Sequence, residues 1–390
     1  MWGGLLEVAL KDRTLKAWRQ FLVFPKVILL SPLRGGKSLS KKQIMTNVIK
    51  TKLDSWYTRM DELWEEVVKR KQVRKGNHRR KKESRTSSVR ALLSRDVKKA
   101  LRTLCSPPLA PKGEATFKAL EDLHPQGSAP QPVADSGVHN FNADTVRRAL
   151  KSFGPGSAGG LFAYTPLLLQ QCMQAETWSF SRQLTTCVNQ LARGEAPRFL
   201  QPFLAGGRSI ALQKPGSGVR PLCCGDPLRR LVAKCFCLAG KDEITQQFHS
   251  RNYGVGCPGG VEIVAHSLRD VVQKYAGTKL ALLKIDFSNA FNSIDREAFM
   301  RATCEVFPTL SRWTNWCYGS PPLLVYDHTR TILSSRGVQQ GDPLGPLYFC
   351  FGIASLVSEI EALLPVYNKW YMDDGESLLT RKPSPRCGHF

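Results

Sequence analysis

The sequence predicts an α+β fold, because short strand-like segments and longer helix-like segments occur in the same chain of 390 residues. The clearest strand is the apolar run at 281–287, which is interrupted by charge and has Asp286 near its end. Residues 208–222 have the composition of a β-hairpin, and a second hairpin is expected around Asp373 and Asp374, after the apolar stretch 363–370 and with a return strand at 376–380. Between residues 41 and 71, apolar side chains recur at steps of three or four, which predicts one amphipathic helix or a broken pair.

The remaining elements follow from the same two periodicities. A helix is expected to start at Asn142, because an asparagine amide can cap a helix N-terminus. The helix predicted at 227–238 has Arg229, Arg230 and Lys234 on an expected basic side. Further helices are predicted at 164–175, 178–193, 261–275 and 292–306 and from the loop 337–346 through Leu356, with a strand pair at 323–326 and 330–333.

Two stretches are predicted to be irregular. Residues 105–140 are rich in Pro, Gly and Ser and are expected to form a linker. Residues 153–160 form a Gly-rich loop, but no strand precedes it and no Gly-Lys-Ser/Thr follows, so it is not a P-loop.

The composition favours a polyanionic partner. The chain contains 56 Lys and Arg against 32 Asp and Glu, a formal net charge of +24, and 42% of its residues are hydrophobic. Such an excess suits nucleic acid first and an acidic membrane surface second. The run 69–90 holds 11 of the basic residues and a single Glu. It is interpreted as a nucleic-acid contact, a nuclear import signal or a solvated arm.

Cysteine usage favours a reducing compartment. The twelve cysteines form no regular framework, and no CxxC pairs with a second CxxC or with two His, so a zinc site is not expected. No stretch of 18 or more residues is apolar, and the first ten residues do not have the pattern of a signal peptide. The predicted location is intracellular, in the nucleus or the cytoplasm, with no membrane span.

Two cations flank the predicted turn of the hairpin at 208–222. Lys214 begins the turn KPGSG and Arg220 follows it, so both side chains can project from the same tip. Two fixed cations on a hairpin suit the binding of a triphosphate. Two ordinary surface charges on a solvated hairpin are the alternative.

Three acids make a second candidate site. Asp286 ends the strand at 281–287, and Asp373 and Asp374 form the end of the motif YMDD. Adjacent strands lie about 4.8 Å apart, so Asp286 and Asp373 could bind the same pair of ions if their strands are neighbours. Two Mg²⁺ ions about 3.5–4 Å apart support nucleotidyl transfer. A single strand-end Asp is more often a cap or an ion-pair partner.

These stretches together resemble a known family. The strand with Asp286, the loop GVQQGDPLGP at 337–346 and YMDD occur in the order found in reverse transcriptases, the RNA-directed DNA polymerases of retroelements. The sequence is most similar to the non-LTR retrotransposon type. The resemblance covers residues 140–380 well and 1–90 loosely.

The resemblance implies roles for single residues. Asp286, Asp373 and Asp374 correspond to the metal-binding catalytic acids. Phe291 corresponds to the bulky residue beneath the sugar, which excludes a 2′-hydroxyl and so favours dNTPs. Gln340 and Gly341 correspond to the loop that lines the dNTP site, and Lys214 and Arg220 to the residues that hold the phosphates.

The resemblance also implies an architecture. It is a right-hand polymerase with fingers and palm present, the thumb missing after YMDD, and a helical, basic N-terminal extension. The expected parts are an N-terminal region at 1–104, the linker at 105–140, fingers and the first part of the palm at 141–280, the palm with the catalytic motifs at 281–382 and a tail at 383–390. No endonuclease or RNase H segment is recognised.

The expected activity is template-directed addition of dNTPs to a DNA or RNA primer on an RNA template, with two Mg²⁺ ions, or Mn²⁺ in their place. One alternative is a catalytically inactive, truncated relic that only binds nucleic acid. An RNA-dependent RNA polymerase is disfavoured, because Phe291 would exclude ribose. A purely structural protein is disfavoured because clustered acids would destabilise it.

Overall fold

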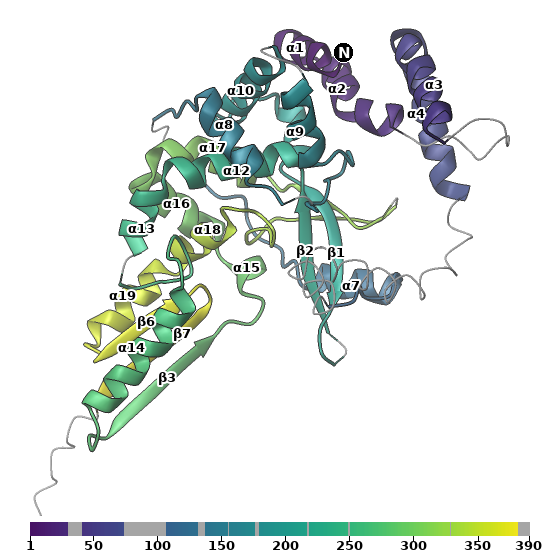
Figure 1. Ribbon diagram of the computed structural model, residues 1–390. Helices are drawn as coiled ribbons and strands as arrows, with labels where there is room; N and C mark the ends of the chain where they lie inside the picture. The colour runs from purple at the N-terminus through teal and green to yellow at the C-terminus, as the bar shows by residue number, and fades with distance from the viewer. Residues whose placement is uncertain are drawn as a thin grey trace, which may run out of the picture. The chain divides into compact units, whose positions relative to one another are not determined.

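The computed structural model falls into two compact units, and each is described by itself (Figure 1). The first contains 1–111, 162–164 and 212–220, and the second contains 112–161, 165–211 and 221–390. The residues that the structure describes within them are 1–29, 41–73, 107–131, 137–154, 156–175, 179–216, 218–248, 250–327 and 329–380. Most of the basic run 69–90 and all of the tail 383–390 lie outside these ranges.

The first unit is mainly helical. Its helices are α1 (Trp2–Asp12), α2 (Leu15–Ile28), α3 (Lys41–Asp54) and α4 (Trp56–Val73). Trp2 stacks on Phe21 with ring centroids 5.3 Å apart, and Phe24 meets Trp56 edge to face at 4.9 Å. The broken pair predicted at 41–71 is confirmed as α3 and α4. The helices α1 and α2 lie inside the N-terminal region that was expected to be helical, but their bounds were not predicted.

The second unit is built from helices around two small sheets. Its helices are α7 (Glu114–Asp122), α8 (Ala143–Lys151), α9 (Pro166–Ala175), α10 (Ser179–Ala192), α11 (Gln201–Leu204), α12 (Pro227–Ala239), α13 (Lys241–Phe248), α14 (Gly260–Lys274), α15 (Ala290–Ser293), α16 (Arg296–Val306), α17 (Pro308–Tyr318), α18 (Gly345–Gly352) and α19 (Ala354–Ala362). Asn142 caps α8 as predicted, because its side-chain oxygen accepts a hydrogen bond of 2.8 Å from the Thr145 amide. The helix α7 lies inside the predicted linker and was not foreseen.

The first sheet has the strand order β2-β1-β4-β5. Its strands are β1 (Gly207–Gln213), β2 (Val219–Gly225), β4 (Leu323–Val325) and β5 (Thr331–Leu333). The neighbours β1 and β2 confirm the predicted hairpin, and β4 and β5 confirm the predicted strand pair. The strands β1 and β4 are parallel, and their pairing joins segments that lie far apart in the sequence.

The second sheet is antiparallel and has the order β3-β7-β6. Its strands are β3 (Leu280–Asp286), β6 (Tyr367–Tyr371) and β7 (Asp374–Thr380). One face packs on apolar residues of α18 and α19, and the fully buried Trp370 of β6 belongs to the same cluster. On the other face, α14 lies against β6, where the Tyr367 hydroxyl donates a hydrogen bond of 2.9 Å to the Val264 carbonyl.

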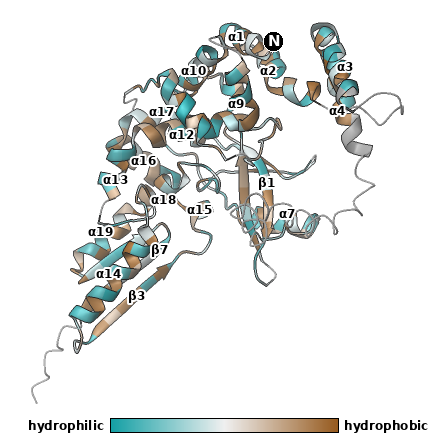
Figure 2. Ribbon diagram, in the orientation of Figure 1, coloured by the Kyte–Doolittle hydropathy of each residue, from teal (hydrophilic) through white to brown (hydrophobic). Residues whose placement is uncertain are grey.

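The strand β3 is apolar in sequence but not buried, since Leu282 is 58% exposed and Leu283 is 41% exposed. Among the described strands β3 stands at the edge of its sheet, so one side of its backbone and part of both faces remain open. Figure 2 shows its hydrophobic residues along the strand.

Two general expectations can be compared with the described residues. None of the described helices is both long and apolar enough to cross a membrane. The ten cysteines that the structure describes are all free, in agreement with a chain that does not depend on disulfides in these segments.

Gly375 generates a stability prediction. A Cβ at this position would lie 2.5 Å from the ring of Trp370, which is completely buried. Gly375→Ala must therefore displace the ring, and we expect the free energy of unfolding to fall by about 1–3 kcal/mol in urea denaturation. Gly154→Ala is the control, because nothing lies within 4 Å of its added Cβ. Equal urea midpoints for the two variants would contradict this packing.

Candidate active site

The antiparallel pairing of β3 and β7 brings the predicted acids together. Asp286 is the direct partner of Asp374 in this register. Directly opposed residues of an antiparallel pair point to the same face, with Cβ atoms about 4.5–5.5 Å apart. Asp373 precedes Asp374 in the short turn between β6 and β7. The neighbouring strands on which the metal hypothesis depended are therefore observed.

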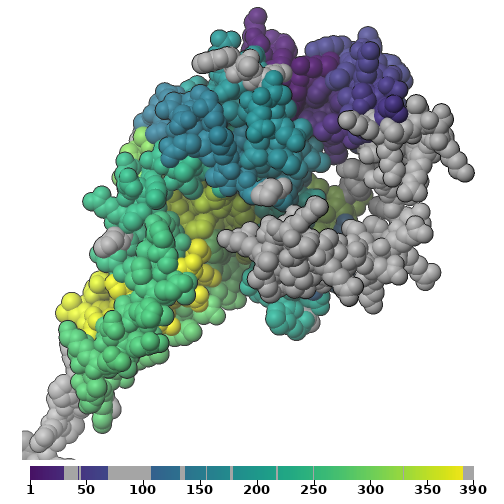
Figure 3. All heavy atoms as spheres, in the orientation of Figure 1, coloured from purple at the N-terminus to yellow at the C-terminus, as the bar shows by residue number. Residues whose placement is uncertain are grey.

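The alternation of side chains separates the acids from the core. Ile285 and Phe287 pack against the apolar cluster, whereas Asp286 lies on the opposite face and is exposed. Asp374 is also exposed, so both carboxylates are accessible from solvent. Figure 3 shows part of the C-terminal segment, coloured yellow, at the surface between green segments of the same unit. The strand therefore presents Ile285 on one face and the charged Lys284 and Asp286 on the other.

A row of charges lies next to the acids on the same face. Glu376 is paired with Lys284 on one side and with Lys369 on the other. This row places one anion between two cations, whereas the row of Asp286 and Asp374 contains two anions and no cation. Like charges directly opposite each other destabilise a sheet. The acid pair therefore favours the binding of a cation from solution.

The donor set at this position is made of carboxylate oxygens. Within the residues that the structure describes, no group of three or more His, Cys, Asp and Glu is gathered closely enough to hold a metal ion. The facing carboxylates of Asp286 and Asp374, with Asp373 beside them, are what this surface offers. Mg²⁺ prefers oxygen and is usually held by one or two carboxylates together with substrate phosphates. The donor set fits such an ion.

The loop that contains Gln340 and Gly341 is held against β2. The Gln340 carbonyl accepts a hydrogen bond of 2.8 Å from the Cys223 amide. Gly341 has a φ of 115°, and a Cβ there would lie 2.4 Å from the Cys223 carbonyl oxygen. Only glycine combines this backbone conformation with so close an approach. The close approach of the loop to β2 therefore explains why the motif has a glycine at position 341.

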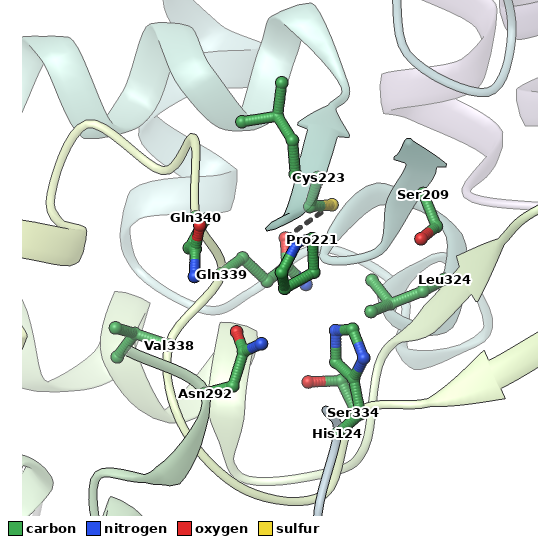
Figure 4. A pocket seen from close by; sticks show the side chains of 11 residues that line it. His124, Ser209, Pro221, Cys223, Asn292, Leu324, Ser334, Val338, Gln339 and Gln340 are labelled. Atoms are coloured by element: carbon green, nitrogen blue, oxygen red, sulfur yellow. Dashed lines mark hydrogen bonds between the residues drawn. The ribbon is translucent and has the colours of Figure 1, made fainter. Parts of the chain in front are cut away.

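A small pocket lies beside this loop (Figure 4). Gln339 and Gln340 line it together with Asn292 and His124. Its free volume is about 10 Å³, which is enough for about one water molecule. The thiol of Cys223, whose pKa burial raises to about 12, donates to Gln339 at 3.2 Å. A nucleotide would therefore have to bind on the open surface and not inside this pocket.

Phe291 lies between the acidic strand and the loop. It follows Asp286 by five residues, just after a left-handed turn at Asn289 with a φ of 54°. Its ring stacks on Phe349 with centroids 5.0 Å apart, and its carbonyl accepts a hydrogen bond of 2.7 Å from the Val338 amide. Phe291 is partly exposed, and the ring of Phe349 supports its ring on one face.

A buried ion pair behind the loop was missed by the sequence analysis. Arg229 was expected on the basic surface of its helix, but its side chain is 2% exposed and pairs with Asp342 at 2.7 Å. Tyr318 donates to the same carboxylate oxygen at 2.8 Å and accepts from Arg229 at 2.9 Å. Burial, and then the Asp342 charge, raise the pKa of Tyr318 well above its ordinary value, so it remains a donor. The guanidinium also bonds Gln339.

The two predicted phosphate-binding cations belong to the other unit. Lys214 and Arg220 are exposed residues of the β1–β2 hairpin, within 212–220 of the first unit. The Lys214 amide donates 2.8 Å to the Gly218 carbonyl, which closes the turn. The acids belong to the second unit. The triphosphate-binding role of the two cations remains a prediction.

The buried ion pair generates a stability prediction. Asp342→Ala leaves Arg229 as an unpaired charge in the core, and we expect the free energy of unfolding to fall by about 3–5 kcal/mol. The control is Asp144→Ala, which removes a solvent-exposed pair with Arg147 and should cost about 1 kcal/mol or less. Urea denaturation of both variants measures the difference. Equal losses would show that the Arg229–Asp342 pair is not buried in solution.

Three comparisons relate the chain to known proteins. Residues 212–381 match the family model described as reverse transcriptase (RNA-dependent DNA polymerase). The retrotransposable element SLACS 132 kDa protein of Trypanosoma brucei gambiense is 25% identical over 279 residues, which are 68% of this chain and 22% of that protein. The chain thus spans about a fifth of the length of this relative.

A solved structure shows a weaker likeness. The apo telomerase of Candida tropicalis, truncated from its C-terminal domain, is 16% identical, with 51% of this chain and 49% of that chain covered. The TM-score of 0.33 is too low to carry an argument. The family match spans β2, the acids and the loop with Gln340. The resemblance carried by the three motifs is therefore confirmed, and residues 212–381 of this chain belong to the reverse transcriptase family.

Proposed function

We propose that this chain is an RNA-directed DNA polymerase of retrotransposon origin, which adds dNTPs to a primer and releases pyrophosphate. The observation that carries the proposal is the register of β3 and β7, which places Asp286 opposite Asp374, next to Asp373, at a solvent-exposed end of the sheet. The family match and the retrotransposable-element relative support the same class. Nucleotidyl transfer needs such a carboxylate pair next to an accessible surface.

The proposal assigns parts of a right-hand polymerase to the chain. Residues 281–382 would form the palm with the catalytic motifs, and 141–280 the fingers with the first part of the palm. The hairpin with Lys214 and Arg220 would be a mobile phosphate-binding part of the fingers.

The acids would hold two Mg²⁺ ions, or Mn²⁺ in their place. Asp286 and Asp373 would contribute ligands to both ions, and Asp374 would support the site. Bound ions of this kind neutralise the triphosphate and activate the primer 3′-hydroxyl. The chain itself provides a rigid sheet that keeps the carboxylates in place, and its apolar cluster fixes the strand that carries Asp286. No large rearrangement of the acids is then needed on binding.

The loop and the aromatic ring would select the nucleotide. Gln340 and Gly341 would line the dNTP surface, since packing on β2 fixes their backbone. Phe291, supported by Phe349, would lie beneath the sugar and clash with a 2′-hydroxyl. A stacked ring moves less than an isolated side chain, so we expect a large preference for dNTP over NTP.

The partners proposed for the chain are an RNA template and a DNA or RNA primer. A formal charge of +24 supports sequence-independent contacts with phosphates, and these contacts should weaken as salt is raised. The proposed location is intracellular, in the nucleus or the cytoplasm, where such templates occur.

Primer extension on an RNA template with Mg²⁺ and dNTPs tests the proposal. We expect extension by the wild type and extension reduced to background by Asp373→Asn, because the substitution removes a charged ligand while preserving size. Asp144→Asn, the same substitution at an exposed position of α8, should retain wild-type extension.

The outcomes of this assay separate the two candidate functions. Extension by Asp373→Asn at the wild-type rate would disprove the assigned catalytic role. If the wild type binds a primer–template without extending it, the chain is a nucleic-acid-binding relic. Thermal melts of the three proteins establish that each is folded before activity is compared.

Sugar selectivity provides an independent prediction. We expect Phe291→Leu to lower the preference for dNTP over the matching NTP by roughly tenfold or more, because a smaller side chain leaves room for the 2′-hydroxyl. Phe287→Leu is the matched control, since Phe287 packs on the same apolar cluster and on Phe349, at 5.9 Å, but has no proposed contact with the sugar. The ratio of dNTP to NTP incorporation is measured for both. A preference that changes equally in the two variants would contradict the assigned role of Phe291.

A further inference from the structure

The turn that presents Asp373 contains a strained residue. Met372 has a φ of 55°, in the left-handed region that residues with a Cβ avoid. Such a conformation costs on the order of 1–3 kcal/mol and persists only where surrounding contacts hold it. The two residues that follow Met372 are the acids. The contacts that hold this turn therefore also determine where the carboxylates lie.

Asn252 supplies those contacts. Its side-chain oxygen accepts a hydrogen bond of 3.0 Å from the Met372 amide, and its side-chain nitrogen donates one of 3.2 Å to the Met372 carbonyl. The same oxygen accepts a third bond, of 3.0 Å, from the Gly254 amide. The side chain is buried, with 5% of the residue exposed. One amide group thus satisfies both backbone groups of the strained residue.

The backbone around Asn252 is docked on the same strand. The Tyr253 amide donates to the Trp370 carbonyl at 2.8 Å, and the Trp370 amide donates to the Arg251 carbonyl at 2.8 Å. Asn252 and Trp370 form a parallel β-bridge. At Gly254 a Cβ would lie 2.4 Å from the Met372 side chain, so the segment can approach this closely only with glycine. Asn252 is therefore held rigidly against the end of β6.

We propose that Asn252 is a positioning residue, which fixes the turn at Met372 so that Asp373 and Asp374 are arranged for metal binding before a metal arrives. The inference rests on the proposed function, since it assigns a purpose to the geometry of the same acids. Without the amide, the turn can relax toward ordinary backbone angles, and the carboxylates then have to be reordered on binding. The cost of this reordering appears as weaker metal affinity.

Asn368 provides a matched control on the opposite face of the sheet. It is also a buried asparagine, 7% exposed, and its side chain also makes three hydrogen bonds. Its partners are Glu361 at 2.7 Å, the Trp370 indole at 3.0 Å and Ser377 at 2.8 Å, none of which belongs to the turn. Asn252→Ala and Asn368→Ala should both lower stability, but only the first should disturb the acids.

The test measures metal binding directly, without nucleotide or template. Mn²⁺ is titrated into the 390-residue chain and the free ion is followed by electron paramagnetic resonance. We expect Asn252→Ala to weaken Mn²⁺ binding by about tenfold to a hundredfold, the range typical of groups that orient metal ligands. Asn368→Ala should stay within about twofold of the wild type. If Asn252→Ala fails to fold, Asn252→Ser takes its place and should show the same loss, because a shorter side chain with one oxygen replaces the separate amide donor and acceptor.

Hydrogen exchange of the Met372 amide gives a second readout that does not depend on a metal. Faster exchange is expected in Asn252→Ala and not in Asn368→Ala. Unchanged Mn²⁺ affinity and amide protection in Asn252→Ala overturn the positioning role, as does an equal loss of Mn²⁺ affinity in the two alanine variants. If the wild type extends primers, such a result leaves the proposed function intact. A wild type that neither binds Mn²⁺ nor extends primers overturns both.

Discussion

The register between β3 and β7 is the constraint on which the candidate site depends. Because side chains alternate between the faces of a sheet, a shift of one residue would turn Asp374 toward the apolar cluster and a core residue toward solvent. Gly375 opposes this shift, since its missing side chain leaves room for the ring of Trp370. The packing of an apolar face therefore determines the position of charged groups on the other face.

A second arrangement of buried groups supports the nucleotide-facing loop. Arg229, Asp342 and Tyr318 hydrogen-bond to one another away from water, and Gln339 joins them next to the loop residue Gln340. Buried ion pairs seldom add net stability, but breaking one is costly, so such a network disfavours alternative loop conformations. The buried residues Gln339 and Asp342 thus hold the loop, while between them Gln340 is partly exposed and Gly341 is exposed.

Periodicity and turn chemistry were sufficient to predict β3, the β1–β2 hairpin and the helices α8, α12 and α14. The three acids were recognised from local motifs, and their adjacency followed once β3 and β7 were neighbours. Contacts between distant segments were not predictable in this way. Arg229 has the local pattern of a surface cation, and only the fold reveals Asp342 beside it. Asn252 likewise has no local pattern that indicates its contact with Met372, which only the fold reveals.

The exposed edge of β3 has a consequence for the behaviour of the purified protein. Among the described strands it pairs on one side only, and Leu282 and Leu283 are open to solvent. Unpaired edges with apolar side chains are templates for intermolecular strand addition and aggregation. Lys284 stands in the middle of this edge, and a charged residue there disfavours the approach of a second copy. The lysine that balances Glu376 within the sheet thus also protects the solubility of the strand that carries Asp286.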